Sequence, residues 1–523
     1  MNPNLSESLK QQVGQLVMVG FDGFVPNAQI AGLIREQRIG GVILFRRNIE
    51  SPAQVAALCR GLQAINAEVS DIPLLIAIDQ EGGMVMRIEA GVTPLPSAMA
   101  YARASANQST DSGSATDCEA LHRIGAAELR QLGININFAP VLDINNNPAN
   151  PVIGIRAFGE DAATVSEYGL AAIRGIQAAG VAATAKHFPG HGDTAMDSHY
   201  ALPVVPHAKA RLDEVELAPF KAAIAAGVDA MMTAHVVFPE FEPDPNTPAT
   251  LSHAVLTGLL RDELGFDRVI FTDCLEMAAI ASGVGVVAGA VQALQAGADL
   301  ILVSHTHALQ QATVLALQEH IASGVLSRER VQQSLARIAR LKQSAAVSDW
   351  AAPFEPQQLQ TPEALALAAS VQAKALQVSE QFQAVDLSLP ILLMTVEVQT
   401  RTEIDEVALG KSTAARGTLL PLLLAANCQV DELIVSPSPT EAEISALLLA
   451  AESYPQVIVQ SYNACLSTAQ QTLLAQLPAE RLWLVAGRLH YDLNLLPNAK
   501  GRLAAYSNRP AALISVAKKL LGQ

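Results

Sequence analysis

The stretch VAATAKHFPGHGDT, residues 181–194, decides the interpretation of this chain, because an apolar run passes directly into a cluster of polar side chains. Residues 181–185 predict a buried strand. Pro189 removes a backbone donor, and Gly190 and Gly192 permit sharp turns where that strand ends. Polar groups crowded at the C-terminal end of a strand are typical of an α/β active site. The alternative is a capped strand end with surface histidines.

Further apolar runs, separated by segments of helical length, recur along the first two thirds of the chain. They cover residues 14–19, 41–45, 74–78, 134–142, 230–234, 269–272 and 300–304. Buried strands that alternate with helices predict a (β/α)8 TIM-type barrel with insertions, and an open doubly wound sheet is the alternative. Polar residues follow most of these runs, as expected where the active-site loops of a barrel begin.

The chain is long enough for two domains. We expect a catalytic barrel over residues 1–345, a linker and connecting helix over 346–374, and a smaller C-terminal α/β sandwich domain over 375–523. Thr361 and Pro362 supply an N-cap residue and a first-turn proline for the connecting helix. Ten of the 11 histidines precede residue 345, so we assign the chemistry to the first domain.

Composition excludes several classes of partner. Asp and Glu outnumber Lys and Arg by 50 to 34, and the net charge of −16 argues against nucleic acid or an anionic membrane surface. The five cysteines are dispersed, which favours free thiols in a reducing compartment. The polar N-terminus has no apolar signal region, and we see no membrane-spanning run. We therefore expect a cytoplasmic protein.

The sequence KHFPGHGDT at 186–194, followed by DSH at 197–199, resembles the β-N-acetylglucosaminidase branch of family 3 glycoside hydrolases in its two-domain form. The resemblance implies an exo-acting, retaining enzyme without a cofactor, which forms a covalent glycosyl-enzyme. It implies that His199 is the acid and then the base, and that Asp197 orients it. It also implies that Asp273, in VIFTDCLEM at 269–277, is the nucleophile, with Glu276 as the rival carboxylate.

The same resemblance assigns sugar-binding positions. They are Asp79, Arg87, Arg156, Lys186 and His187, and structural ion pairs are the alternative for the two arginines. The chain departs from the family pattern at Met84, where an Arg is usual, and at Met86, where a polar residue is common. These two changes bear on subsite detail.

Other functions stay open. His187, His191 and Asp193 could bind a metal at helical spacing, but Pro189 and the glycines disfavour a helix there, so we expect no metal. A GlcNAc phosphorylase, a β-glucosidase or xylosidase, and a non-catalytic sugar-binding protein are the alternative functions. We expect a small carbohydrate as partner, either a GlcNAc-containing muropeptide or a chitin oligomer, and the oligomeric state is open.

Overall fold

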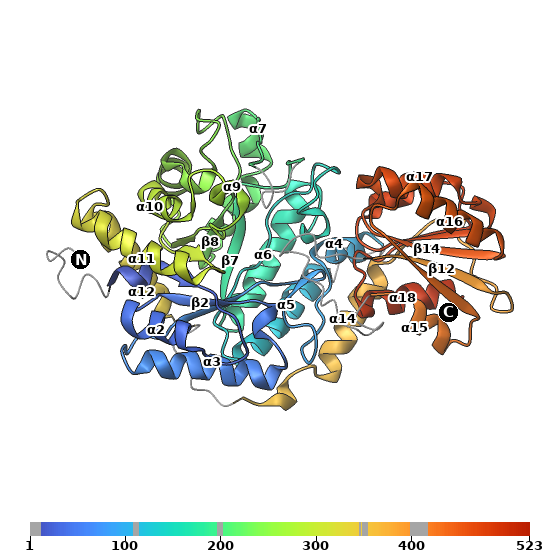
Figure 1. Cartoon of the computed structure of the whole chain (residues 1–523), viewed down its shortest axis with the longest axis horizontal. Coiled ribbons are helices and arrows are strands. Elements are labelled where there is room, and N and C mark those ends of the chain that lie inside the picture. Colours follow the sequence, from blue (N-terminus) through green and yellow to red (C-terminus); the bar gives the residue numbers. More distant parts are fainter. Residues whose placement is uncertain (1–11, 108–113, 196–201, 345–346, 348–353, 398–416) are drawn as a thin grey trace.

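A computed structural model describes residues 12–107, 114–195, 202–344, 347, 354–397 and 417–523. Eight parallel strands form one sheet in the order β10-β1-β2-β3-β6-β7-β8-β9 (Figure 1). They are β1 (Val17–Val19), β2 (Gly41–Leu44), β3 (Leu75–Ile78), β6 (Ile136–Asn137), β7 (Ala182–Phe188), β8 (Ala230–Thr233), β9 (Val269–Phe271) and β10 (Ile301–Val303). A parallel bridge from Phe271 to Leu300 joins the two ends of the sheet. The predicted (β/α)8 barrel is confirmed.

Helices follow the strands and form the outer layer of the barrel (Figure 1). They are α2 (Ala28–Gln37), α3 (Pro52–Ala67), α4 (Ala98–Ala106), α5 (Ser114–Gln131), α6 (Ala162–Ala178), α7 (Lys209–Glu214), α8 (Ala218–Ala225), the π-helical η5 (Ala254–Glu263), α9 (Ala278–Ala281), α10 (Val286–Ala296), α11 (His307–Ala322) and α12 (Arg328–Lys342). Ser51, Asp161 and Ser327 cap α3, α6 and α12 by accepting backbone N–H bonds. An antiparallel hairpin, β4 (Gln80–Gly82) and β5 (Val85–Met86), follows β3.

The strand predicted at 14–19 is observed only at Val17–Val19, since Gly14–Leu16 form a 3-10 helix, and two further strands differ for identifiable reasons. The run at 134–142 pairs continuously only at Ile136–Asn137, because Asn135 and Asn137 use their side chains to bond the backbone of the neighbouring segment. Pro140 has no N–H with which to extend the ladder. The run at 181–185 is longer than predicted, since Phe188 still pairs with Thr233. Lys186 and His187 therefore lie within β7, where Lys186 forms a bridge with Val141 and the His187 backbone N–H bonds Asp143.

The C-terminal domain has a six-stranded sheet in the order β11-β16-β15-β14-β12-β13. The strands are β11 (Gln377–Val378), β12 (Ile391–Val396), β13 (Val430–Val435), β14 (Gln456–Ser461), β15 (Leu482–Ala486) and β16 (Gly501–Ala504). Helices α15 (Leu420–Ala425) and α18 (Pro510–Leu520) pack on one face, and α16 (Glu441–Glu452) and α17 (Thr468–Gln476) pack on the other. This arrangement confirms the predicted α/β sandwich.

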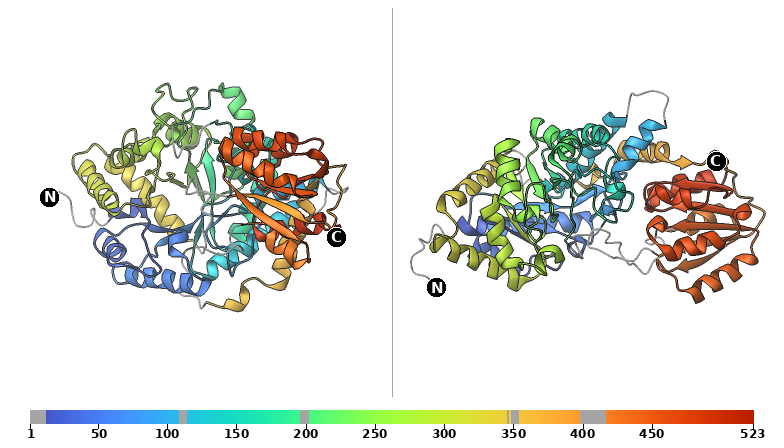
Figure 2. Two further views of the ribbon diagram at one scale, coloured as in Figure 1. Left: turned by 45° about the vertical axis from the view of Figure 1, so that its right-hand side comes forward. Right: turned by 90° about the horizontal axis from the view of Figure 1, so that it is seen from above.

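Helix α14 (Pro362–Ala375) connects the two domains, and Thr361 caps it as expected. It packs against α4 and α5 of the barrel and against α18 of the second domain. Figure 2 shows the second domain beside the barrel, and Figure 1 shows α4 on the side of the barrel that faces it. The boundaries predicted at 345 and 375 stay a prediction, because part of the connecting segment lies outside the described residues. Within the described ranges, none of the helices is both long and apolar enough to cross a lipid bilayer.

Candidate active site

A cavity opens where several barrel strands end, and it collects polar side chains from distant parts of the sequence. Its charged and histidine lining consists of Asp79, Glu81, Arg87, Arg156, Lys186, His187 and Asp273. Phe45, Phe138 and Met277 supply apolar walls, which suit the apolar face of a sugar ring. The space among these residues is about 550 Å³, a volume that includes solvent at the open side of the cavity.

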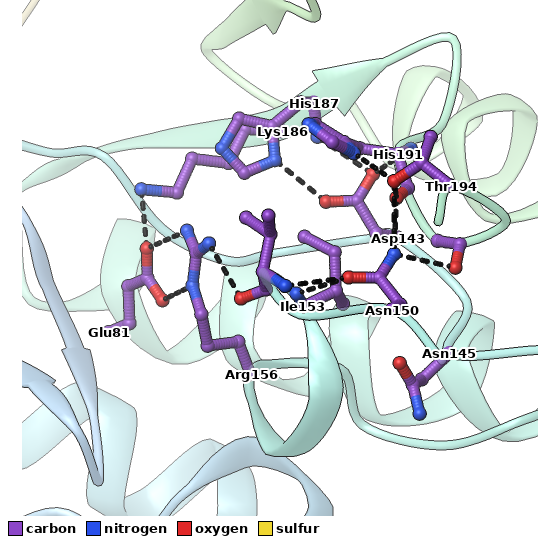
Figure 3. A network of polar contacts seen from close by, with 12 residues as sticks. Glu81, Asp143, Asn145, Asn150, Ile153, Arg156, Lys186, His187, His191 and Thr194 are labelled. Atoms are coloured by element: carbon purple, nitrogen blue, oxygen red, sulfur yellow. Dashed lines mark hydrogen bonds and ion pairs between the residues drawn. The ribbon is translucent and has the colours of Figure 1, made fainter. Parts of the chain in front are cut away.

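A buried ion-pair network forms one wall of the cavity (Figure 3). Arg156 donates two hydrogen bonds to Glu81, from Nε at 2.9 Å and from Nη2 at 2.8 Å. Lys186 Nζ lies 2.6 Å from Glu81 Oε1 and 2.8 Å from Asp79 Oδ1. Arg87 Nη2 is 3.5 Å from Asp79 Oδ2. The five residues hold one another in place before any ligand binds.

Burial alone would disfavour the ionised forms of Glu81 and Lys186, but the opposite charges beside them outweigh the effect of burial on their pKa values. Burial raises the pKa of Glu81, yet Arg156 and Lys186 bring the pKa well below its ordinary range. Burial lowers the pKa of Lys186, whereas Asp79 and Glu81 raise it above the ordinary value. Both groups are thus ionised at neutral pH. The wall therefore offers fixed charged acceptors and donors to sugar hydroxyls.

His187 is held by a carboxylate that has no exposure to solvent (Figure 3). Asp143 Oδ2 lies 2.7 Å from His187 Nδ1, and Asp143 Oδ1 accepts a 2.7 Å hydrogen bond from the His191 backbone N–H. Burial raises the pKa of Asp143, but His187 and the further bonds leave it below its ordinary value. An ionised Asp143 fixes the ring of His187, so that Nδ1 faces the carboxylate and Nε2 is the nitrogen left for other partners.

Asp273 lies two residues after the end of β9 and lines the cavity half-buried. Its Oδ1 accepts a 2.7 Å hydrogen bond from the backbone N–H of Cys274. His235 contacts the same turn: its Nε2 donates a 2.9 Å hydrogen bond to the Cys274 carbonyl. This bond fixes the backbone where it leaves β9. Glu276 points elsewhere: its oxygens accept bonds from the backbone N–H groups of His305 and Thr306, at 2.6 and 2.9 Å.

The structure brings together most of the residues that the sequence singled out. The five predicted sugar-binding residues and Asp273 line one cavity. Asp197 and His199 lie outside the described residues. In the described part of the chain, Met84 and Met86 are buried and neither lines this cavity.

Two functional positions were missed. They are Glu81, which accepts bonds from Arg156 and Lys186, and Asp143, which pairs with the ring of His187. Their place in the sequence carried a signal, because Glu81 stands two residues after Asp79 and Asp143 is the first acid after its strand.

A metal at the predicted alternative ligands does not fit the observed bonds. His187 Nδ1 faces Asp143, and His191 Nδ1 faces Thr194 Oγ1 at 3.0 Å. A different group, Asp193 with His207 and Glu216, has ligand atoms within 4.8 Å of one another. The pairing of Asp193 with His207 at 2.7 Å, and of Glu216 with Arg211, accounts for this cluster as ion pairs.

Comparison with known proteins identifies the class. The Glycosyl hydrolase family 3 N terminal domain matches residues 8–341, more than half of the chain, so the chain belongs to this family. It is accordingly a glycoside hydrolase, as the motifs predicted.

Solved and curated relatives agree with this class. The chain is similar to a glycoside hydrolase family 3 β-N-acetylglucosaminidase from Paenibacillus sp. str. FPU-7, with 48% identity, a TM-score of 0.90, and coverage of 99% of this chain and 97% of that one. It is 38% identical to the Beta-hexosaminidase A of Pseudoalteromonas piscicida over 60% of this chain, and spans 55% of that relative's length. It is 40% identical to a Beta-hexosaminidase of Pseudomonas aeruginosa strain LESB58 over 58% of this chain and 86% of the relative.

Proposed function

We propose that this glycoside hydrolase is an exo-acting, retaining β-N-acetylglucosaminidase that removes terminal β-linked GlcNAc. The observation that carries the proposal is the convergence of Asp273 with the predicted sugar-binding groups in one small cavity. The resemblance of the motifs at 186–194 and 197–199 to this branch of the family supports exo action. The similarity to a solved family 3 β-N-acetylglucosaminidase supports the choice of sugar.

In this proposal Asp273 attacks the anomeric carbon and forms the glycosyl-enzyme. His199, oriented by Asp197, gives its proton to the leaving oxygen and later takes a proton from water. The assignment of the nucleophile to Asp273 and of the acid to His199 agrees with the charges in the cavity. The other two carboxylates there, Asp79 and Glu81, already pair with Lys186 and the arginines. The backbone N–H of Cys274, which donates to Asp273 Oδ1, helps to orient this carboxylate where the strand ends.

The charges that line the cavity favour water over phosphate as the second substrate. Three carboxylates and three permanent cations cancel formally: Asp79, Glu81 and Asp273 against Arg87, Arg156 and Lys186. A phosphate ion needs an excess of positive charge, whereas a neutral GlcNAc unit needs paired donors and acceptors. We therefore put hydrolysis ahead of phosphorolysis.

A product assay separates these reactions. The purified chain is incubated with nitrophenyl β-GlcNAc, nitrophenyl β-glucoside and chitobiose, each with and without inorganic phosphate. The proposal expects free GlcNAc at the same rate in both conditions and little release of glucose. GlcNAc-1-phosphate that accumulates only with phosphate would replace hydrolysis by phosphorolysis. Preferential cleavage of the glucoside would replace the proposed sugar.

We further propose that the natural substrates are GlcNAc-anhydro-muropeptides of peptidoglycan recycling in a bacterial cytoplasm, with chitin oligomers as the alternative. All five cysteines are free thiols, and burial raises the pKa of Cys59 to about 12, so this thiol is unreactive. Free thiols are ordinary in a reducing compartment. Comparing kcat/KM on a GlcNAc-anhydro-MurNAc disaccharide and on chitobiose distinguishes the two substrate classes.

A further inference from the structure

One segment of the barrel connects the sugar cavity to the turn that precedes Asp197 and His199. It runs from Asn145 to Glu160 and is called the 145–160 loop below. It carries Arg156, which lines the cavity. It also carries Asn150, whose Nδ2 donates to the carbonyl oxygens of His191 at 2.9 Å and Gly192 at 2.8 Å (Figure 3). A shift of this loop would therefore move both Arg156 and the turn at His191 and Gly192.

The second domain forms hydrogen bonds with both ends of this loop. The hydroxyl of Tyr491 accepts a 3.0 Å hydrogen bond from Asn145 Nδ2 and donates one to Glu160 Oε1. The side chain of Asn145 continues inward, since its Oδ1 accepts a 3.0 Å bond from the backbone N–H of Gly154. One hydroxyl thus ties the first residue of the loop to the last.

The middle of the loop is covered by the same segment of the second domain. Gly154 has a φ of +49°, and a Cβ added there would lie 2.7 Å from Leu489 Cδ2, so Leu489 rests directly on the backbone. Arg488 Nη2 reaches the Val152 carbonyl at 3.5 Å. Leu489 is 2% exposed and belongs to the apolar core of the barrel. The segment Arg488–Tyr491 is therefore part of the packing of the first domain.

We propose that the segment Arg488–Tyr491 gives the second domain a role in the reaction, with Tyr491 as a positioning residue that holds the 145–160 loop. This inference rests on the proposed function. Tyr491 is not among the residues that line the cavity, so it acts through Arg156 and through the turn that Asn150 supports. Displacement of binding groups by about 1 Å costs up to roughly 100-fold in rate, so a lost hydroxyl is measurable.

The test is Tyr491→Phe, which removes the hydroxyl and keeps the ring. The matched control is Tyr454→Phe, because Tyr454 donates its hydroxyl to Asp431 at 2.7 Å within the second domain. We expect Tyr491→Phe to lose about 10- to 100-fold in kcat/KM on nitrophenyl β-GlcNAc and to weaken competitive inhibition by free GlcNAc. The control should match the wild type in both, and the Tm of each variant should stay near the wild-type value.

A second pair of variants tests the same bond from its other side. Glu160→Gln keeps an oxygen for the Tyr491 hydroxyl and should retain most activity, whereas Glu160→Met should reproduce Tyr491→Phe. If Tyr491→Phe behaves like Tyr454→Phe, the positioning role is wrong. If it lowers the Tm without weakening GlcNAc inhibition, the contact serves only stability, and the role is equally wrong. A wild-type chain inactive on GlcNAc substrates would instead remove the proposed function.

Discussion

Replacing Glu81 by Gln tests whether the buried ion-pair wall holds the site together. The change keeps the shape of the side chain but leaves Arg156 without its charged partner and Lys186 with Asp79 alone, at 2.8 Å. Removing one partner of a buried ion pair costs about 3–5 kcal/mol. We expect the lower end, about 3 kcal/mol, because Asp79 still balances one of the two cations. The measurement is the free energy of unfolding of the barrel in urea, with the KM for nitrophenyl β-GlcNAc, which should rise.

The same substitution at the surface is the control. Glu68 accepts two bonds from Arg35, at 2.6 and 2.8 Å, so Glu68→Gln removes an ion pair of the same geometry. The Arg35 and Glu68 side chains are 45% and 51% exposed, and solvent screens them, so stability should change little. Equal losses in the two variants would refute the reasoning, since burial would then not set the cost.

The sign of the pH dependence gives a second check on Glu81. Its pKa is lower in the folded chain than in the unfolded one, so its contribution is present above the unfolded pKa, near 4.3, and disappears as the pH falls further. The difference in stability between wild type and Glu81→Gln should therefore be constant near neutral pH and narrow below about pH 4. A difference that widened on acidification would contradict an ionised Glu81.

Three further predictions follow from the remaining residues. Asp197→Ala should slow cleavage of a natural disaccharide far more than that of a nitrophenyl substrate, and equal losses would remove the assigned role of His199. Burial lowers the pKa of His122 from 6.5 to about 4, so the unfolded chain binds the proton first and stability falls as the pH drops from 6.5 to 4. His122→Asn should flatten that fall in pH-dependent urea unfolding, and an unchanged slope would be evidence against a neutral buried ring. Glu276→Gln should keep kcat within about tenfold on nitrophenyl β-GlcNAc, since its oxygens serve backbone N–H groups, and inactivation would make it the rival nucleophile.

Strand positions and the cluster of polar groups could be predicted because they depend on local pattern. Continuous apolar runs predicted all eight barrel strands, and the polar residues after them meet at one end because parallel strands carry them there. The ends of the strands were less predictable. Whether Asn135 and Asn137 bond the backbone of a neighbour, and so interrupt the ladder, is decided by tertiary contacts and not by local sequence.

Which side chains pair with one another within the site could not be predicted either, because these pairs also depend on tertiary contacts. Glu81 and Arg156 are 75 residues apart, and Asp143 and His187 are 44 residues apart, so nothing local links them. The hydrogen bond between Tyr491 and Asn145 joins residues that are 346 positions apart and belong to different domains. Residue types at strand ends indicate which groups are available, whereas the barrel geometry decides which of them pair.

The most direct test of the central claim is to trap the covalent intermediate. The enzyme is treated with an activated, fluorinated GlcNAc that slows hydrolysis of a glycosyl-enzyme, digested, and analysed by tandem mass spectrometry. We predict one added sugar on the peptide that contains residues 269–277, with fragment ions that locate it on Asp273, and no adduct in Asp273→Ala. A sugar located on Glu276, or on no carboxylate of this peptide while the enzyme is inactivated, would contradict this prediction.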